Sequence, residues 1–150
     1  MYDKEQLYNQ INPLAVKLEL ERFPEQIRNQ KSKVRDLKRA FDDVDTDRAT
    51  RELEILADIT GEPDPNTGKA KFSNDKARQA ELSKRVKIDA EYISAGMKSR
   101  NAEIALNQAQ DELDMLENKY RSCRYRSELI ASELRFWAGT EKEDNSHQAY

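Results

Sequence analysis

An uninterrupted heptad repeat in the second half of the chain does most to restrict its possible folds. Apolar or small residues recur there at alternating steps of four and three, and no proline follows Pro65. The repeat comprises Ile88, Tyr92, Ala95, Ser99, Ala102, Leu106, Ala109, Leu113, Leu116, Tyr120, Cys123, Ser127, Ile130, Leu134 and Trp137. Roughly seven heptads in one register indicate a coiled-coil helix. We predict one helix from about Ser73 to Ala138, with Ser73, Asn74 or Asp75 as its N-cap.

The composition agrees with long helices. Charged residues make up 37% of the chain and aromatic residues 7%, and the four glycines and four prolines are confined to a few places. Such a charged chain could also be disordered. The strict period of the apolar residues favours helices instead.

The first half of the sequence predicts two further helices. Residues 3–22 form a short helix in this interpretation, with a possible new start at Asn12–Pro13, and Pro24 is expected to interrupt it. A second helix then begins near Pro24, and Gly61 is expected to end it before the loop "EPDPNTG". Its apolar stripe slips once in phase, as in a stutter. The stripe comprises Ile27, Val34, Leu37, Phe41, Val44, Ala49, Leu53, Leu56 and Ile59.

These elements combine into an all-α fold. Small residues in the first half of the long repeat allow two helix axes to approach closely. We therefore expect the second helix to fold back antiparallel after a turn at 61–72. The predicted organisation is an N-terminal helical extension (1–23), a long antiparallel coiled-coil helical hairpin (24–138) and a flexible polar tail (139–150).

The bulkier half of the repeat predicts a homo-oligomer. The fold-back covers the long helix only to about residue 110, so residues 113–137 lack an obvious intrachain partner unless residues 3–22 cover part of them. An apolar stripe of this length is not expected to stay in water. The predicted oligomer interface comprises Leu113, Leu116, Tyr120, Cys123, Ile130, Leu134 and Trp137.

Cysteine usage and hydropathy predict a cytoplasmic protein. Cys123 is the only cysteine, so no intrachain disulfide can form and a reducing compartment is expected. The N-terminus has no apolar stretch of the kind found in signal peptides. No apolar run approaches the ~20 residues that a membrane span needs. We predict no membrane contact, and the host cytoplasm as the location if a phage encodes the chain.

Residues that carry catalysis are scarce. His147 is the only histidine and lies in the polar tail, and Cys123 lies on the heptad seam. The acidic run at 42–47 lacks the glycine and closing glutamate of a calcium loop. Motifs that bind nucleotide phosphates or zinc are also absent. We predict that the protein is not an enzyme and holds no metal and no cofactor.

Three basic clusters, at 28–39, 69–87 and 119–126, alternate with acidic blocks although the net charge is −3. Charge blocks on exposed helices commonly select register and partner. Lysine and arginine also neutralise phosphates, and Tyr125 lies off the seam, where a base could stack on it. The predicted DNA-binding residues are Lys76, Arg78, Lys84, Arg85, Lys87, Lys119, Arg121, Arg124, Tyr125 and Arg126.

The layout resembles the small helical accessory proteins of phage recombination, and in particular the UvsY-type recombination mediators. The resemblance covers roughly residues 28–138. It rests on a helix that ends at a glycine, a short Gly/Asp/Pro loop, and "KFSNDKARQAELSKRVKIDAEY" opening a long helix with basic and aromatic residues toward its end. It implies a non-enzymatic, ring-like oligomer that binds single-stranded DNA and helps to load a recombinase onto strands covered by single-strand-binding protein. The matching positions are the basic residues of 76–87 and 119–126.

Two functional hypotheses remain open. The first is a phage-type recombination or replication accessory protein that binds single-stranded DNA as an oligomer. The second is a structural or scaffolding coiled coil, such as a phage assembly chaperone or adaptor, that binds a protein and no DNA.

Overall fold

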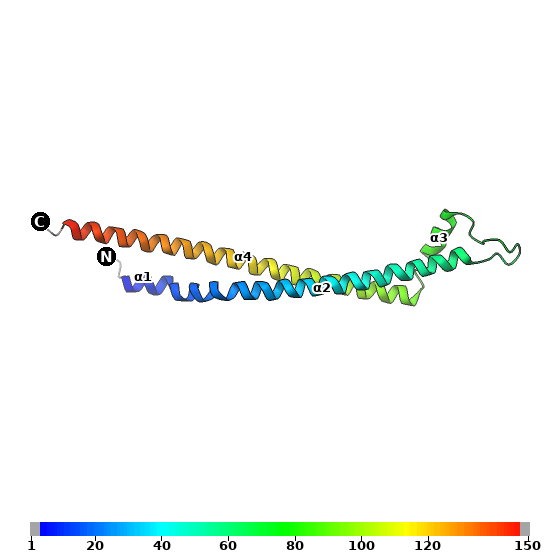
Figure 1. Cartoon of the computed structure of the whole chain (residues 1–150), viewed down its shortest axis with the longest axis horizontal. Coiled ribbons are helices and arrows are strands. Elements are labelled where there is room, and N and C mark those ends of the chain that lie inside the picture. Colours follow the sequence, from blue (N-terminus) through cyan, green and yellow to red (C-terminus); the bar gives the residue numbers. More distant parts are fainter. Residues whose placement is uncertain (1–3, 148–150) are drawn as a thin grey trace. The chain divides into compact units, whose positions relative to one another are not determined.

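The computed structural model describes residues 4–147, which form four α-helices and no β-strand (Figure 1). The helices are α1 (Lys4–Ile11), α2 (Pro13–Gly61), α3 (Asp75–Arg85) and α4 (Ala90–His147). The predicted all-α class is confirmed. None of the described helices is both long enough and apolar enough to cross a membrane.

The chain divides into two compact units, to both of which α2 and α4 contribute. Unit 1 comprises Met1–Ser32 and Asp111–Tyr150, and unit 2 comprises Lys33–Gln110. Each unit has its own set of buried side chains.

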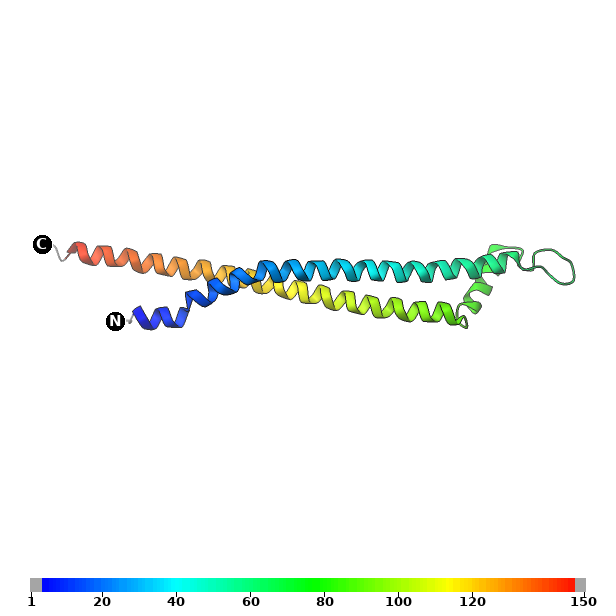
Figure 2. The ribbon, with the colours of Figure 1, turned by 60° about the horizontal axis from the view of Figure 1, so that its bottom comes forward.

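In unit 1, the first part of α2 packs against α4 in the antiparallel direction, and the two ribbons cross in the view of Figure 2. The Cys123 thiol donates to the carbonyl of Val16 over 3.9 Å, and the ring centroids of Phe23 and Tyr120 lie 5.8 Å apart. Farther along α2, the Lys31 ammonium lies 2.9 Å from the Glu117 carboxylate. Partner numbers fall along α4 as they rise along α2, which fixes the antiparallel direction.

The helix break in this unit occurs at Asn12, whereas the predicted break at Pro24 is wrong. Asn12 has a φ of 44°, in the left-handed region, and its side chain accepts from the Ala15 amide over 3.3 Å at the start of α2. Pro24 lies inside α2 and is exposed. A proline removes one backbone hydrogen bond from a helix interior. Here the contact between Phe23 and Tyr120, one residue away, holds the helix against α4.

Residues 113–130 have an intrachain partner, and part of it comes from residues 3–22, as one of the two alternatives left open by the sequence expected: Val16 contacts Cys123 and Glu19 contacts Arg126. Leu113 and Cys123 are only 6% and 4% exposed, and Ile130 is half-buried. Because α2 starts at Pro13, it has enough residues to cover this part of α4. Leu134 and Trp137 are 45% and 46% exposed.

In unit 2, the second part of α2 packs against the first part of α4, again antiparallel. Arg51 contacts Asp89, Arg48 contacts Tyr92, and Asp45 contacts Ser99. α3 closes one end of this pair. Its Leu82 is buried against Ile55 and Ile59 of α2.

α3 and α4 are separate helices, so the predicted single helix from Ser73 to Ala138 is wrong. Asn74 is the N-cap of α3, since its side chain accepts from the Ala77 amide over 2.8 Å. α3 ends at Arg85, and α4 restarts after a turn because Asp89 caps it: Asp89 Oδ1 accepts from the Tyr92 amide over 2.7 Å. Ile88, predicted to lie on the seam, is 82% exposed in this turn.

Of the predicted C-terminal ends of the two long helices, that of α2 is confirmed and that of α4 is wrong. α2 ends at Gly61, as predicted, and the following loop reaches a left-handed conformation at Gly68, with a φ of 64°. α4 continues to His147, so residues 139–147 of the predicted flexible tail are helical. Residues 148–150 of that predicted tail lie outside the described residues.

Candidate nucleic-acid interface

The outward face of α3 carries positive charge only. Lys76 and Lys84 are exposed and lie about 80° apart around the helix, and Lys87 is exposed in the turn that follows α3. Residues 79, 80 and 83 share this face and are uncharged. We call this surface the α3 lysine face, defined by Lys76, Lys84 and Lys87. Within the described residues, none of these three ammonium groups has a carboxylate partner.

The acidic residues of α3 flank this face and pair with arginines. Asp75 binds Arg78 over 3.1 Å, and Glu81 binds Arg85 over 2.9 Å. Arg85 also binds Glu62, where α2 meets the loop. The Arg85 guanidinium, helped by the Lys71 ammonium, lowers the pKa of Glu62.

Arg78 and Arg85 are therefore engaged in contacts within unit 2. Arg78 Nε donates to the carbonyl of Phe72 over 3.1 Å, and both arginines are half-buried. A phosphate would have to compete with these carboxylate and carbonyl partners for the two guanidinium groups. Of the five DNA-binding residues predicted in this segment, Lys76 and Lys84 lie on the exposed face of α3, Lys87 lies in the turn that follows, and the two arginines are engaged in packing.

In unit 1, the residues predicted at 119–126 lie on two different flanks of α4. Arg121, Arg124 and Tyr125 lie on one flank, in a groove that they share with Lys31 of α2. The remaining lining residues of this groove are Ile27, Glu117, Tyr120 and Glu128. Tyr125 is 65% exposed, so its ring is open to a stacking partner. Glu117 lies 2.9 Å from Lys31, and Glu128 lies 3.9 Å from Arg124, so this flank has mixed charge.

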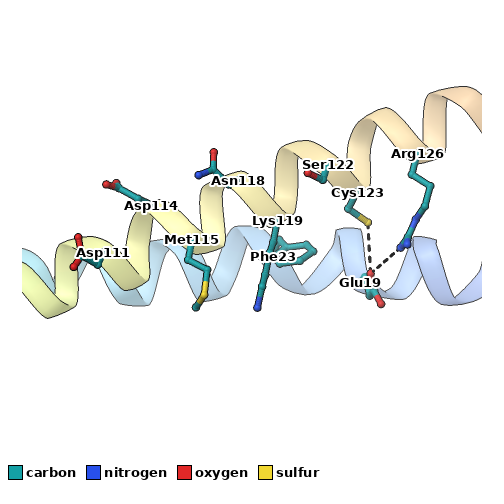
Figure 3. A pocket seen from close by; sticks show the side chains of 10 residues that line it. All are labelled: Glu19, Phe23, Asp111, Asp114, Met115, Asn118, Lys119, Ser122, Cys123 and Arg126. Atoms are coloured by element: carbon teal, nitrogen blue, oxygen red, sulfur yellow. Dashed lines mark hydrogen bonds and ion pairs between the residues drawn. The ribbon is translucent and has the colours of Figure 1, made fainter.

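Lys119 and Arg126 lie on the opposite flank, in a pocket that also contains carboxylates (Figure 3). The Arg126 guanidinium lies 3.3 Å from the Glu19 carboxylate, and the Cys123 thiol points at the same carboxylate over 3.7 Å. Asp111 and Asp114 line the other end of the pocket. Carboxylates at both ends of the pocket make this flank a poor site for phosphate.

Sequence reasoning missed Lys31 as a neighbour of Arg121. It lies in the first basic cluster, far from 119–126 in sequence, and only the antiparallel packing places it in the same groove. The signal that could have found it was Phe23, four residues before Ile27, which continues the predicted apolar stripe toward the start of α2. No group of three or more histidine, cysteine or acidic side chains within the described residues is placed to hold a metal ion.

Comparisons of this chain with family models, with curated proteins and with solved structures found no match.

Proposed function

We propose that the chain is a non-enzymatic accessory protein that binds single-stranded DNA through its phosphates, with the α3 lysine face as the principal contact. The observation that carries this proposal is a patch of one charge sign on a chain whose net charge is −3. Lysines without carboxylate partners can release counterions from a phosphate backbone, and this release drives binding without regard to base sequence.

The second contact in this proposal is the groove of Arg121, Arg124 and Tyr125. Its exposed tyrosine supplies the base stacking that distinguishes single strands from duplexes. The two glutamates in the groove reduce its attraction for phosphate, so we assign it strand preference and the α3 lysine face most of the affinity.

The proposal extends to assembly. The antiparallel pairs of α2 and α4 form a coiled-coil hairpin, and Leu134 and Trp137 at the exposed end of the seam contribute to a homo-oligomer in the cytoplasm. Several copies of the lysine face on one strand would raise the overall affinity through effective concentration. A recombinase or a single-strand-binding protein is the partner that this function calls for.

The test is fluorescence anisotropy of labelled single-stranded and double-stranded oligonucleotides at low salt and at ~200 mM salt. We expect saturable binding that prefers single strands and weakens with salt. Charge reversal at Lys84 and Lys87 (Lys84→Glu, Lys87→Glu) should weaken binding at least tenfold. It should also flatten the salt dependence, by about 0.7 in the slope for each phosphate that the variant no longer neutralises.

The matched control reverses two exposed lysines away from the face, Lys17→Glu and Lys38→Glu, with the same change in net charge. It should weaken binding by less than about threefold, because long-range charge effects are screened beyond ~10 Å at 0.1 M salt. Equal losses of affinity in the two double variants, or no binding by the wild type at low salt, would contradict the proposal.

A structural or scaffolding role is the second candidate. It is favoured by the ion pairs between α2 and α4 in unit 1, Lys31–Glu117 and Arg126–Glu19, which use basic residues to set helix register. This candidate predicts no affinity for DNA at low salt and binding to a protein through the exposed apolar side chains.

A further inference from the structure

In unit 2, α4 exposes a second apolar stripe on the side opposite its buried seam. Ile93, Met97 and Ile104 are 43%, 64% and 47% exposed. At 100° per residue, the three side chains lie within about 40° of one another around the helix. The seam residue Ser99, by contrast, is 5% exposed. We call the three exposed residues the outer stripe.

The two borders of the outer stripe differ in chemistry. One border carries Arg100 and Glu103, both exposed. The other border carries only uncharged polar side chains, which are Ser94, Asn101 and Gln108. Neither Arg100 nor Glu103 forms an ion pair within the described part of the chain.

We propose that a second copy of this chain docks on the outer stripe through the same stripe, antiparallel, with the two-fold axis between residues 100 and 101. In this register, Met97 of one copy lies level with Ile104 of the second copy. The apolar side chains of the two copies then cover each other, which removes them from water.

Charge complementarity selects this arrangement. In an antiparallel pair related by a two-fold axis, like borders face each other. Arg100 then lies beside Glu103 of the second copy, offset along the helix by about 3 Å, and the symmetry repeats the pair. The border with Ser94, Asn101 and Gln108, here called the amide border, faces the same border of the second copy. Asn101 and Gln108 can exchange hydrogen bonds there. A parallel pair would instead place Arg100 against the amide border and leave Glu103 unpaired.

This surface is separate from the predicted oligomer interface at residues 113–137. It is also small, and small interfaces are weak. We therefore expect a concentration-dependent dimer. It does not depend on the proposed DNA binding, so either proposal can fail alone.

Sedimentation velocity over a range of protein concentrations provides the first test. The wild type should associate, and Met97→Lys should shift the midpoint of association at least tenfold toward higher concentration. Leu53→Lys is the matched control, because Leu53 is a comparably exposed apolar residue (65%) on α2. Association that is unchanged by Met97→Lys, or abolished equally in both variants, would overturn the proposal.

A charge-swap mixture tests the antiparallel register. Arg100→Glu and Glu103→Arg should each weaken self-association, because each places like charges together. An equimolar mixture of the two variants should recover it, since both ion pairs are restored between unlike chains. Failure of the mixture to recover association would reject this register.

Oxidative cross-linking then locates the two-fold axis. Asn101→Cys should form a disulfide-linked dimer on mild oxidation, because the two introduced thiols lie next to the axis. The wild type is the control, since its only cysteine, Cys123, is 4% exposed. An Asn101→Cys chain that cross-links no more than the wild type would contradict the proposal. Cross-linking reports on this interface alone, so the result can be interpreted even if a second interface keeps the chains together.

Discussion

The Asp89 carboxylate caps the first turn of α4 and also binds an arginine of α2. Its Oδ1 accepts from the Tyr92 amide at the first turn of α4, and Arg51 of α2 binds both of its oxygens over 3.1 and 2.7 Å. The Arg51 hydrogen bonds, followed by the Tyr92 amide, lower the pKa of Asp89 from 3.8 to about 2. The same contact ties the turn after α3 to α2.

Asp89→Asn should therefore lower the melting temperature at pH 7, because the amide can cap α4 but cannot pair with the Arg51 guanidinium. A depressed carboxyl pKa contributes stability that is present above the unfolded value and lost as the pH falls toward the folded value. The difference in melting temperature between wild type and variant should thus shrink between about pH 4 and about pH 2. Thermal unfolding followed by circular dichroism measures it. Asp58→Asn, at an exposed carboxylate of α2, is the control, and a difference that stays constant with pH would contradict the assignment.

The candidate site could be predicted from the sequence only in part, because some of its charged residues pair with residues from distant elements. Lys76 and Lys84 could be placed on one exposed face from helical spacing alone. Arg85 could not be assigned, because its partner Glu62 lies 23 residues away across a loop. The pairing of Arg126 could not be foreseen either, since its partner Glu19 belongs to the other end of the chain. Local periodicity identifies faces, but it does not report which charges a distant element will neutralise.

At the scale of elements, the heptad repeat predicted which side of α4 would be buried. Ser99, Ala109, Leu113 and Cys123 are all buried. The same regularity concealed the turn at 86–89, because Ile88 continues the period by coincidence while neither proline nor glycine marks the break. Asp89 three residues before Tyr92 was the available capping signal.

The N-cap of α3 offers a direct test of element-level reasoning, since the sequence left Ser73, Asn74 and Asp75 open. Asn74→Ala should lower the free energy of unfolding by about 1 kcal/mol, the usual cost of losing an N-cap side chain. Ser73→Ala should cost less than about 0.5 kcal/mol, because an exposed side chain away from a cap contributes little. Urea denaturation measures both. A larger effect at Ser73 than at Asn74 would place the cap, and with it the start of the lysine face, elsewhere.

At the scale of the whole molecule, the buried side chains are unevenly distributed. Ile59 is fully buried, at 0% exposed, and it packs with Ile55 and Leu82 in a three-helix corner of unit 2. Unit 1 has no such corner among its described residues, where Val16, Leu113 and Cys123 are buried along a single pair of helices. Stability in such a chain is expected to be local, with segments that open at different free energies.

Ile59→Ala should therefore act on unit 2 first. Truncation of a fully buried isoleucine typically costs about 2–5 kcal/mol, because it removes apolar packing and leaves a cavity. Hydrogen exchange should show that amides of α3 and of residues 55–61 lose protection, while amides of residues 113–123 keep theirs. Leu53→Ala, at an exposed position on the same helix, should leave both segments unchanged. An equal loss of protection in the two units after Ile59→Ala would contradict this prediction. It would mean that the chain unfolds as one cooperative body because the helices α2 and α4 are continuous through both units. The division into two units would then have no counterpart in the free energy of unfolding.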